Sequence, residues 1–349
     1  MSDIALYRKY RPGTFKEVIG QETIIEALKG AIDAGTVAHA YLFSGTRGTG
    51  KTSIARIFAK ALKTDDSDIY EIDAASNTGV DDIRELKESV NTLPFRSEYK
   101  FYIIDEVHML SKSAFNAFLK TLEEPPAHVV FVLATTEIEK LPDTVVSRCQ
   151  VHTFKKPNQK TLSLMVQRVA KKEGYALEKS SADSIALLGD GSFRDTLGIL
   201  QKVLSSSVDK EITAEEVERI TGAPKLGLIH QYVRGIVEKD SEKGIEAVKK
   251  AVDGNIDMKV FFKLILQRMR YVLLLRYAPK MEHALKLQVS EDEFEFLIEI
   301  ARNKEYEFNS ETLVTLLRAY DEIKIAFIPS RELNKSPTLS FFKISILFI

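Results

Sequence analysis

One eight-residue run constrains the fold of this chain more than any other feature. It reads Gly45-Thr46-Arg47-Gly48-Thr49-Gly50-Lys51-Thr52 and fits the phosphate-binding pattern G-x-x-x-x-G-K-[ST] at every specified position. Glycines in such a loop let the backbone fold round a triphosphate with its amide groups pointing inward. A short apolar run at 41–43 precedes the loop and a helical pattern at 53–62 follows it. The sequence therefore predicts a strand, a phosphate-binding loop and a helix, and this context disfavours a simple glycine-rich turn.

This loop gives the first set of predicted nucleotide-binding residues. They are Gly45, Thr46, Arg47, Gly48, Thr49, Gly50, Lys51, Thr52 and Ser53. Lys51 can reach the terminal phosphates and is also a candidate catalytic residue, and the Thr52 hydroxyl can bind Mg²⁺.

Bulk composition is that of a water-soluble globular protein. The chain has 349 residues, which suggests two or three domains. Hydrophobic residues make up 44% and charged residues 28%, and the net charge of -1 gives no general attraction to nucleic acid. The single cysteine, Cys149, excludes an internal disulfide and an all-cysteine metal site. The N-terminus lacks the apolar core of a signal peptide, so we expect a cytoplasmic protein without membrane association.

Alternating apolar runs and helical patterns between about residues 38 and 155 predict a parallel sheet with crossover helices. The expected strands lie at 41–43, 69–72, 101–104, 129–134 and 151–154. After Pro157 the pattern becomes helical throughout, and Thr221-Gly222-Ala223-Pro224 reads as a linker between two helical parts. We predict an α/β nucleotide-binding domain at 1–156, a helical lid at 157–222 and an all-α domain at 223–349. A terminal helix is expected after Ser336-Pro337.

Two carboxylates follow the third predicted strand. Asp105 can hold Mg²⁺, directly or through water, and Glu106 can polarise the water that attacks a γ-phosphate. The alternative is a strand that ends in solvated charges, and the phosphate-binding loop upstream makes it the weaker one. His108 completes a helicase-type Asp-Glu-Val-His box, and it is either a polar residue at the strand's end or a catalytic one.

Three further side chains have a functional and an ordinary interpretation. Thr136 can place a hydroxyl near the acidic pair, or it can reflect the β-propensity of threonine. Arg148 can be a surface charge, or a finger that enters a neighbouring subunit's site. Arg194 can fold over the phosphates of its own subunit, or it can pair with Asp195 or another acid.

These motifs, in this order, resemble the AAA+ ATPases and, within them, the gamma/tau subunits of the bacterial DNA polymerase III clamp loader. The segments that carry the resemblance are Tyr7–Pro12, Val18–Gln21, His39–Phe43, Glu71–Ser76, Asp105–Leu110 and Leu119–Pro126. The resemblance is strong over residues 1 to about 225 and looser beyond. It implies a P-loop AAA+ domain with a five-stranded parallel sheet, a small helical lid and an all-α collar that serves in oligomerisation.

The resemblance also implies roles for individual residues. Arg11, Pro12, Val18, Ile19 and Gly20 border the adenine of ATP. Thr136 is the first sensor, Arg148 the finger that acts in trans, and Arg194 the second sensor. The catalytic set is then Glu106, Asp105, Lys51, Arg148, Thr136 and Arg194, with Thr52 and Asp105 on Mg²⁺.

Two departures from the family pattern matter. Family members usually insert a four-cysteine zinc module before the second strand, whereas residues 61–69 run straight across without a cysteine, so we predict no zinc. The polymerase-binding and helicase-binding extensions of the long tau form are expected to be absent, as in a gamma-length form or in a truncated piece of a longer chain. The phosphate-binding loop is intact, unlike that of many delta-prime subunits.

The implied function is an ATP hydrolase within the DNA polymerase III holoenzyme, in which ATP opens a sliding clamp and loads it onto primed DNA. Its implied partners are delta, delta-prime and further gamma/tau copies in a pentameric ring, the clamp, primer-template DNA and, indirectly, single-strand-binding protein. One alternative is a structural subunit that binds nucleotide without hydrolysis. Another is a helicase or branch-migration motor, which the Asp105–His108 box suggests and the long helical tail disfavours.

Overall fold

The computed structural model describes residues 4–326 except 77–79, 208, 255 and 307. The chain divides into two compact units. The first, called the sheet unit here, comprises Met1–Pro157 together with Gly189–Gly198. The second, the helical unit, comprises Asn158–Leu188 and Ile199–Ile349. The terminal helix predicted after Ser336-Pro337 lies outside the described residues.

The sheet unit is built on five strands and six complete α-helices among its described residues. The strands are β1 (Ala40–Ser44), β2 (Ile69–Asp73), β3 (Lys100–Asp105), β4 (Val129–Thr135) and β5 (Gln150–Thr153). The helices are α1 (Leu6–Lys9), α2 (Glu22–Asp33), α3 (Lys51–Ala61), α4 (Val80–Val90), α5 (Lys112–Glu123) and α6 (Asp143–Val146). Short 3₁₀ turns lie at η1 (Phe15–Glu17), η2 (Asp66–Asp68), η3 (Val107–Met109) and η4 (Ile138–Lys140).

All five strands are parallel and lie in the order β2-β3-β4-β1-β5. The strand β1 therefore lies between β4 and β5, with Leu42 opposite Leu133 of β4 and Val151 of β5. Because the strands are parallel, the carboxyl ends of β1, β3 and β4 meet at one edge of the sheet. The predicted five-stranded parallel sheet is confirmed, and each predicted strand overlaps an observed one.

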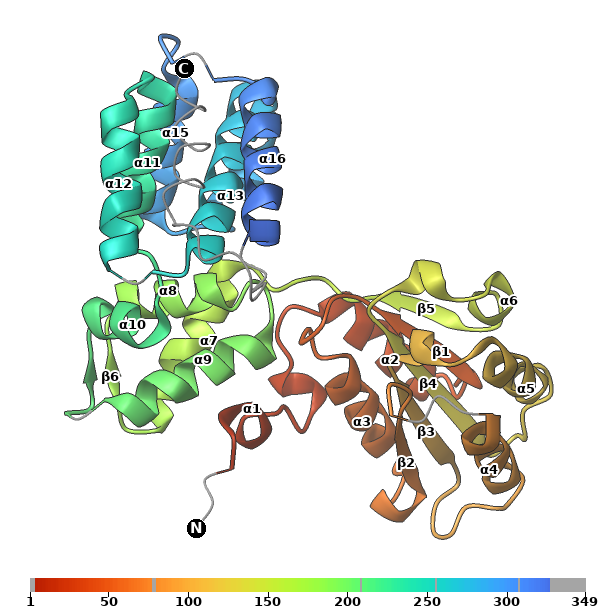
Figure 1. Ribbon diagram of the computed structural model, residues 1–349. Helices are drawn as coiled ribbons and strands as arrows, with labels where there is room; N and C mark the ends of the chain where they lie inside the picture. The colour runs from red at the N-terminus through yellow and green to blue at the C-terminus, as the bar shows by residue number, and fades with distance from the viewer. Residues whose placement is uncertain (1–3, 77–79, 208, 255, 307, 327–349) are drawn as a thin grey trace. The chain divides into compact units, whose positions relative to one another are not determined.

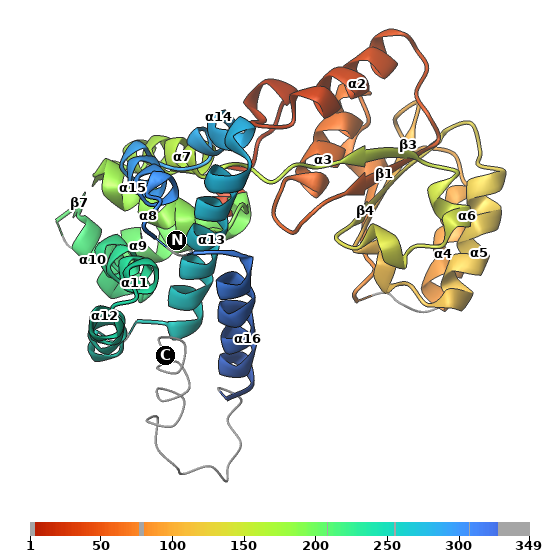
Figure 2. The same ribbon diagram turned by 90° about the horizontal axis from the view of Figure 1, so that it is seen from above.

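Helices cover both faces of this sheet, as Figures 1 and 2 show. On one face α4, α5 and α6 bury a core that includes Leu86, Phe118 and Val145. On the other face α2 and α3 bury Leu28 and Phe58 against the sheet. This two-sided burial explains why β4 is apolar without alternation, since all seven of its residues are buried.

Local sequence signals set the ends of α5. The Ser111 hydroxyl accepts a hydrogen bond from the Ala114 amide at 3.2 Å, which satisfies one of the donors left over at a helix start. Pro125 and Pro126 follow its last turn, where a helix cannot continue.

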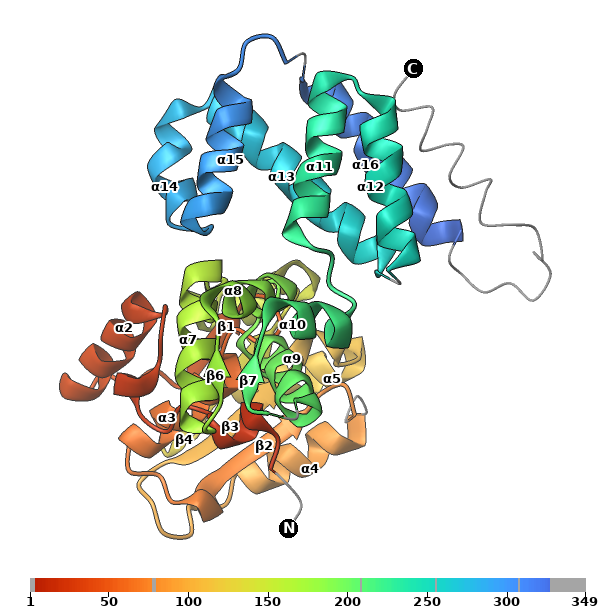
Figure 3. The same cartoon turned by 90° about the vertical axis from the view of Figure 1, so that its left-hand side faces the viewer.

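The helical unit contains α7 (Gln159–Lys172), α8 (Lys179–Leu188), α10 (Ala214–Thr221), α11 (Leu226–Glu238), α12 (Ser241–Asp253), α13 (Met258–Tyr277), η5 (Pro279–Met281), α14 (Glu282–Lys286), α15 (Glu291–Arg302) and α16 (Ser310–Ala326). The helix α9 (Phe193–Ser206) contributes residues to both units. The largest core of the helical unit joins α11, α12, α13, α15 and α16, and Figure 3 shows α11 beside α12. Buried residues of α13 such as Phe261, Ile265 and Val272 make this helix a core element of the unit.

The prediction that the chain is helical throughout after Pro157 is wrong in one place. Two short parallel strands, β6 (Ala176–Leu177) and β7 (Glu211–Ile212), pair with each other. Each is only two residues long, so no alternating pattern can develop in the sequence. None of the helices described in the structure combines the length and apolar character that a membrane span requires.

Candidate nucleotide-binding site

The phosphate-binding loop connects β1 to α3 at the carboxyl edge of the sheet, as predicted. Gly48 and Gly50 have φ angles of +75° and +104°, in the region that favours glycine. A Cβ atom at Gly48 would lie 2.0 Å from the Ser192 Oγ, and one at Gly45 would lie 2.8 Å from the Phe154 carbonyl oxygen. The glycines are therefore required by backbone conformation and by close packing.

The start of α3 completes this loop. Gly50 precedes its first residue, Lys51, so the unpaired amide groups of the first helical turn face the loop. Thr49 is buried and its hydroxyl donates to the Thr46 carbonyl at 2.8 Å, while Thr46 and Arg47 are exposed. A buried side chain thus fixes a loop whose outer residues face solvent.

The Lys51 amine is directed back into the loop. It donates to the carbonyl oxygens of Gly45 at 2.7 Å and Thr46 at 3.0 Å, and the residue is 5% exposed. Burial lowers the pKa of Lys51, and the carboxylates of Glu106 and Asp105 oppose that shift. These two acids compensate a charge that is otherwise costly to bury.

Two hydroxyl–carboxylate pairs lie at the same edge. The Thr52 hydroxyl donates to Asp105 Oδ2 at 2.7 Å, which joins α3 to the end of β3. The Thr136 hydroxyl donates to Glu106 Oε2 at 3.0 Å, which joins the end of β4 to the residue after β3. Glu106 has φ 47° and ψ 44°, a left-handed conformation that is uncommon for a residue with a side chain.

These pairs fit a magnesium ion and a triphosphate. Thr52 and Asp105 place a hydroxyl and a carboxylate oxygen together, and Mg²⁺ prefers oxygen ligands. Among the described residues, no group of three or more His, Cys, Asp or Glu side chains could hold a metal ion. A magnesium site here therefore depends on the hydroxyl, on water and on the phosphates of the nucleotide, which is the usual arrangement for this ion.

The predicted adenine-binding residues lie on the segment between α1 and α2. Arg11 donates from Nε to the Ser53 hydroxyl at 2.9 Å, so it contacts the first turn of α3. Burial, followed by the nearby charge of Arg56, lowers the pKa of Arg11. Pro12, Val18, Ile19 and Gly20 are half-buried, and Val18 packs against the apolar core that contains α3.

Arg194 lies beside the phosphate-binding loop in the sheet unit. The Phe193 amide donates to the Gly48 carbonyl at 2.9 Å, which holds residues 192–194 against the loop. The Arg194 guanidinium lies 5.1 Å from the centre of the Tyr7 ring, a cation–π contact. Neither Tyr7 nor Ser192 was a predicted site residue.

Arg148 contacts a different part of the sheet unit. Its guanidinium donates to Glu123 Oε1 and to the Thr144 carbonyl, each at 2.6 Å, and so ties it to α5 and α6. Its side chain is 33% exposed. The structure thus brings Lys51, Thr52, Asp105, Glu106 and Thr136 together, and it places Arg148 with α5 and α6.

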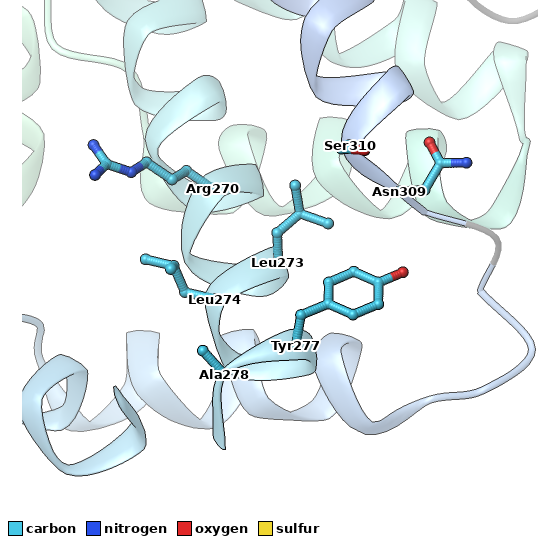
Figure 4. A pocket seen from close by; sticks show the side chains of 7 residues that line it. All are labelled: Arg270, Leu273, Leu274, Tyr277, Ala278, Asn309 and Ser310. Carbon is cyan, nitrogen blue, oxygen red and sulfur yellow. The ribbon is translucent and has the colours of Figure 1, made fainter. Parts of the chain in front are cut away.

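A separate hollow of about 500 Å³ lies in the helical unit, shown in Figure 4. It is lined by Arg270, Leu273, Leu274, Tyr277, Ala278, Asn309 and Ser310. None of the residues predicted for nucleotide binding lines it, and its walls are mostly apolar, so it does not suit a triphosphate.

Two known families match different parts of the chain. The family described as "DNA polymerase III, delta subunit" matches residues 20–76 and 63–158, and "DNA polymerase III subunits gamma and tau domain III" matches residues 212–334. In solved structures, the chain is similar to the RuvB Holliday junction branch migration motor of Thermotoga maritima, with 20% identity, a TM-score of 0.54, and coverage of 90% of this chain and 98% of that one. At this identity the likeness concerns the fold alone, and it agrees with the predicted fold class.

Curated relatives are closer in sequence. The chain is 40% identical to DNA polymerase III subunit tau of Bacillus subtilis over 83% of its own length and 55% of that protein's, so it spans about half of that relative. It is 33% identical to DNA polymerase III subunit gamma of Buchnera aphidicola subsp. Schizaphis graminum, over 84% of this chain and 86% of that one. We conclude that the chain belongs to the DNA polymerase III gamma/tau family.

Proposed function

We propose that this chain is an ATPase subunit of a replicative clamp loader. In this proposal, ATP binding and hydrolysis drive the opening of a sliding clamp and its loading onto primed DNA. The observation that carries the proposal is the pairing of Thr52 with Asp105 and of Thr136 with Glu106 beside the phosphate-binding loop. Membership in the gamma/tau family supports the clamp-loader role.

In this proposal the loop residues bind the phosphates, and the acidic pair acts on Mg²⁺ and on the attacking water. The loop amides and Lys51 bind the phosphates, and Lys51 exchanges its carbonyl partners for phosphate oxygens. Thr52 and Asp105 hold Mg²⁺, which when bound neutralises charge on the β- and γ-phosphates. Glu106 orients the attacking water and accepts its proton, and Thr136 holds the Glu106 carboxylate in place.

Two arginines have separate roles in this proposal, Arg194 as the second sensor and Arg148 as the finger that acts in trans. Arg194 reports the nucleotide state to its own subunit, supported by its position beside Gly48. Arg148 acts on a neighbour's nucleotide, and its partly exposed position just after α6 supports that role. Arg11, Pro12, Val18, Ile19 and Gly20 border the adenine, and we propose that no zinc is bound.

The proposed partners are delta, delta-prime and further gamma/tau copies in a pentameric ring, the sliding clamp, primer-template DNA and, indirectly, single-strand-binding protein. The proposed domains are 1–156, 157–222 and 223–349, with the last as the collar, and the proposed location is the cytoplasm. The likeness to RuvB concerns the fold alone, so it does not favour a branch-migration activity.

The test is ATP turnover with and without primed DNA, clamp and the other loader subunits, comparing wild type with Arg148→Ala. We expect a defect that appears only in the assembled complex and that a neighbour carrying the arginine rescues. Turnover that does not respond to the clamp and DNA would refute the clamp-loader role, and unchanged turnover in the variant would refute the role of Arg148.

A further inference from the structure

His108 lies between two carboxylates at the edge of the candidate site. It belongs to η3, directly after the turn made by Asp105 and Glu106, and its side chain is 8% exposed. Its Nδ1 lies 3.0 Å from the Thr135 Oγ1 and 3.5 Å from the Glu106 Oε2. Its Nε2 lies 3.8 Å from the Glu137 Oε2. The imidazole ring therefore has an oxygen facing each nitrogen.

Thr135 connects this ring to β4, a strand that lies between β1 and β3 in the sheet. It is the last residue of β4, and it is fully buried. Its Oγ1 accepts a hydrogen bond from the Glu137 amide at 3.0 Å while it contacts His108 Nδ1. The position of the His108 ring is thus set by a strand that is hydrogen-bonded to β1 and β3.

Glu137 lies on the other side of the ring. It forms an ion pair with Lys140 of η4, and the pKa of Glu137 is lowered first by its hydrogen bond to Lys140 and also by the nearby His108. A charged carboxylate beside Nε2 favours one orientation of an imidazole ring, as carboxylates do for catalytic and metal-binding histidines.

The Glu106 carboxylate needs such support. Its backbone is left-handed and lies outside the strand, and its Oε2 is shared between the Thr136 hydroxyl at 3.0 Å and His108 Nδ1 at 3.5 Å. A general base has to be held in place, because a displacement of about 1 Å can reduce turnover by about 100-fold.

We infer that His108 is a positioning residue that holds the Glu106 carboxylate, through contacts to Thr135 and Glu137, in the orientation needed for ATP hydrolysis. The inference rests on the proposed function, because it assigns His108 to the same reaction. A purely structural role would be to satisfy the Thr135 hydroxyl, and the two roles differ in what they predict for turnover.

The experiment measures ATP turnover and Mg²⁺-ATP affinity in the reconstituted loader for His108→Ala, His108→Asn, Glu106→Gln and the double variant His108→Ala/Glu106→Gln. The exposed His283→Ala is the control. For His108→Ala we expect turnover to fall by about 10- to 100-fold with ATP affinity unchanged. His108→Asn keeps a polar atom near the Nδ1 position, so it should recover most of the turnover.

The double variant separates the possibilities. If His108 acts through Glu106, His108→Ala causes no further loss in the Glu106→Gln background. An equal loss in both backgrounds, a parallel loss of ATP affinity, or wild-type turnover of His108→Ala would overturn the inference. If His108→Ala does not fold, His108→Asn and its double variant decide in the same way. Failure of the proposed function is distinct, because wild type would then lack turnover or Glu106→Gln would match wild type.

Discussion

Two sets of paired charged and polar side chains, one in each unit, differ in how they meet solvent. At the sheet edge, Asp105 ends β3 and Glu106 follows it, and both are half-buried and accept hydrogen bonds from hydroxyl groups. In the helical unit, Arg268 and Glu293 are each 3% exposed and lie 2.9 Å apart, and His230 lies 3.0 Å from the second Glu293 oxygen.

The side chains at the sheet edge can exchange their hydrogen-bond partners for a ligand, whereas the buried Arg268–Glu293 pair cannot. The partners at the sheet edge are neutral hydroxyls and backbone carbonyls, which a phosphate or a metal ion can replace at low cost. The buried pair has no ligand to exchange with. Burial would raise the pKa of Glu293, but Arg268 and then His230 hold that pKa below its usual value. We therefore expect changes at the sheet edge to affect chemistry, and changes in the buried pair to affect stability.

The largest expected effect is that of Glu106→Gln. Loss of the proposed general base should reduce ATP turnover by about 100- to 10,000-fold, while Mg²⁺-ATP still binds. Single-turnover hydrolysis in the reconstituted loader measures it, with the exposed Glu88→Gln as control. Turnover equal to wild type would show that Glu106 has no part in hydrolysis, and it would contradict the expectation that changes at the sheet edge affect the chemistry.

Next is Glu293→Ala, which leaves the Arg268 charge buried without its partner. We expect a loss of about 3–5 kcal/mol in the stability of the helical unit and no change in nucleotide affinity. Hydrogen exchange of the full chain reports α13 and α15 separately from the sheet. The exposed Glu295→Ala on the same helix is the control, and Arg268→Met with Glu293→Leu should restore much of the loss. An unchanged exchange rate in α13 would show that the pair contributes little.

Gly48→Ala tests the closeness of the phosphate-binding loop to residues 192–194. An alanine here would have to adopt a positive φ, and its Cβ would lie against Ser192. We therefore expect the loop conformation to be less stable by about 1–3 kcal/mol, which should appear as weaker ATP binding. Gly30→Ala, where no neighbouring atom is within 4 Å and the residue lies inside α2, should instead stabilise the chain slightly. Equal ATP affinity in Gly48→Ala and wild type would contradict the tight packing.

The smallest expected effect concerns Asp68, a fully buried carboxylate outside both sets. It accepts hydrogen bonds from the amides of Phe95, Arg96 and Ser97 at 2.5, 2.8 and 2.9 Å. Burial would raise the pKa of Asp68, but these donors outweigh it and lower the pKa. Asp68→Asn should cost about 1–2 kcal/mol at neutral pH.

The sign of the pH dependence follows from that lowered pKa. The stabilising contribution of Asp68 is present in full above the pKa of an unfolded aspartate, about 4, and is lost as the pH falls through the lower folded pKa. The difference in melting temperature between wild type and Asp68→Asn should therefore decrease as the pH falls from 4 to 3. A constant difference across this range would contradict the assignment.

The loop and the strands that meet at the sheet edge could be predicted because each is encoded by residues close together in the sequence. The loop 45–52, the acidic pair and the apolar strands each lie within one short run, so pattern and spacing suffice. The Arg268–Glu293 pair was not predicted, because its members are 25 residues apart and belong to no motif. His108 was noticed but not assigned, since only the fold shows that Thr135 and Glu137 face its ring.

The same limit applies to Arg276, at the end of α13. Its guanidinium donates to the carbonyl oxygens of Ile300, Ala301, Asn303, Tyr306 and Phe308. These acceptors are backbone atoms at and after the end of α15, so they leave no trace in side-chain patterns. Burial of a helix end is visible only once the chain is folded.

The most direct test of the central claim is calorimetric titration of this chain with a non-hydrolysable ATP analogue and Mg²⁺, comparing wild type with Lys51→Ala. We expect wild type to bind one analogue per chain, and Lys51→Ala to bind roughly tenfold to 100-fold more weakly because charged hydrogen bonds to the phosphates are lost. Absence of binding to wild type, or equal affinity in the two proteins, would contradict the assignment of the sheet edge as a nucleotide site.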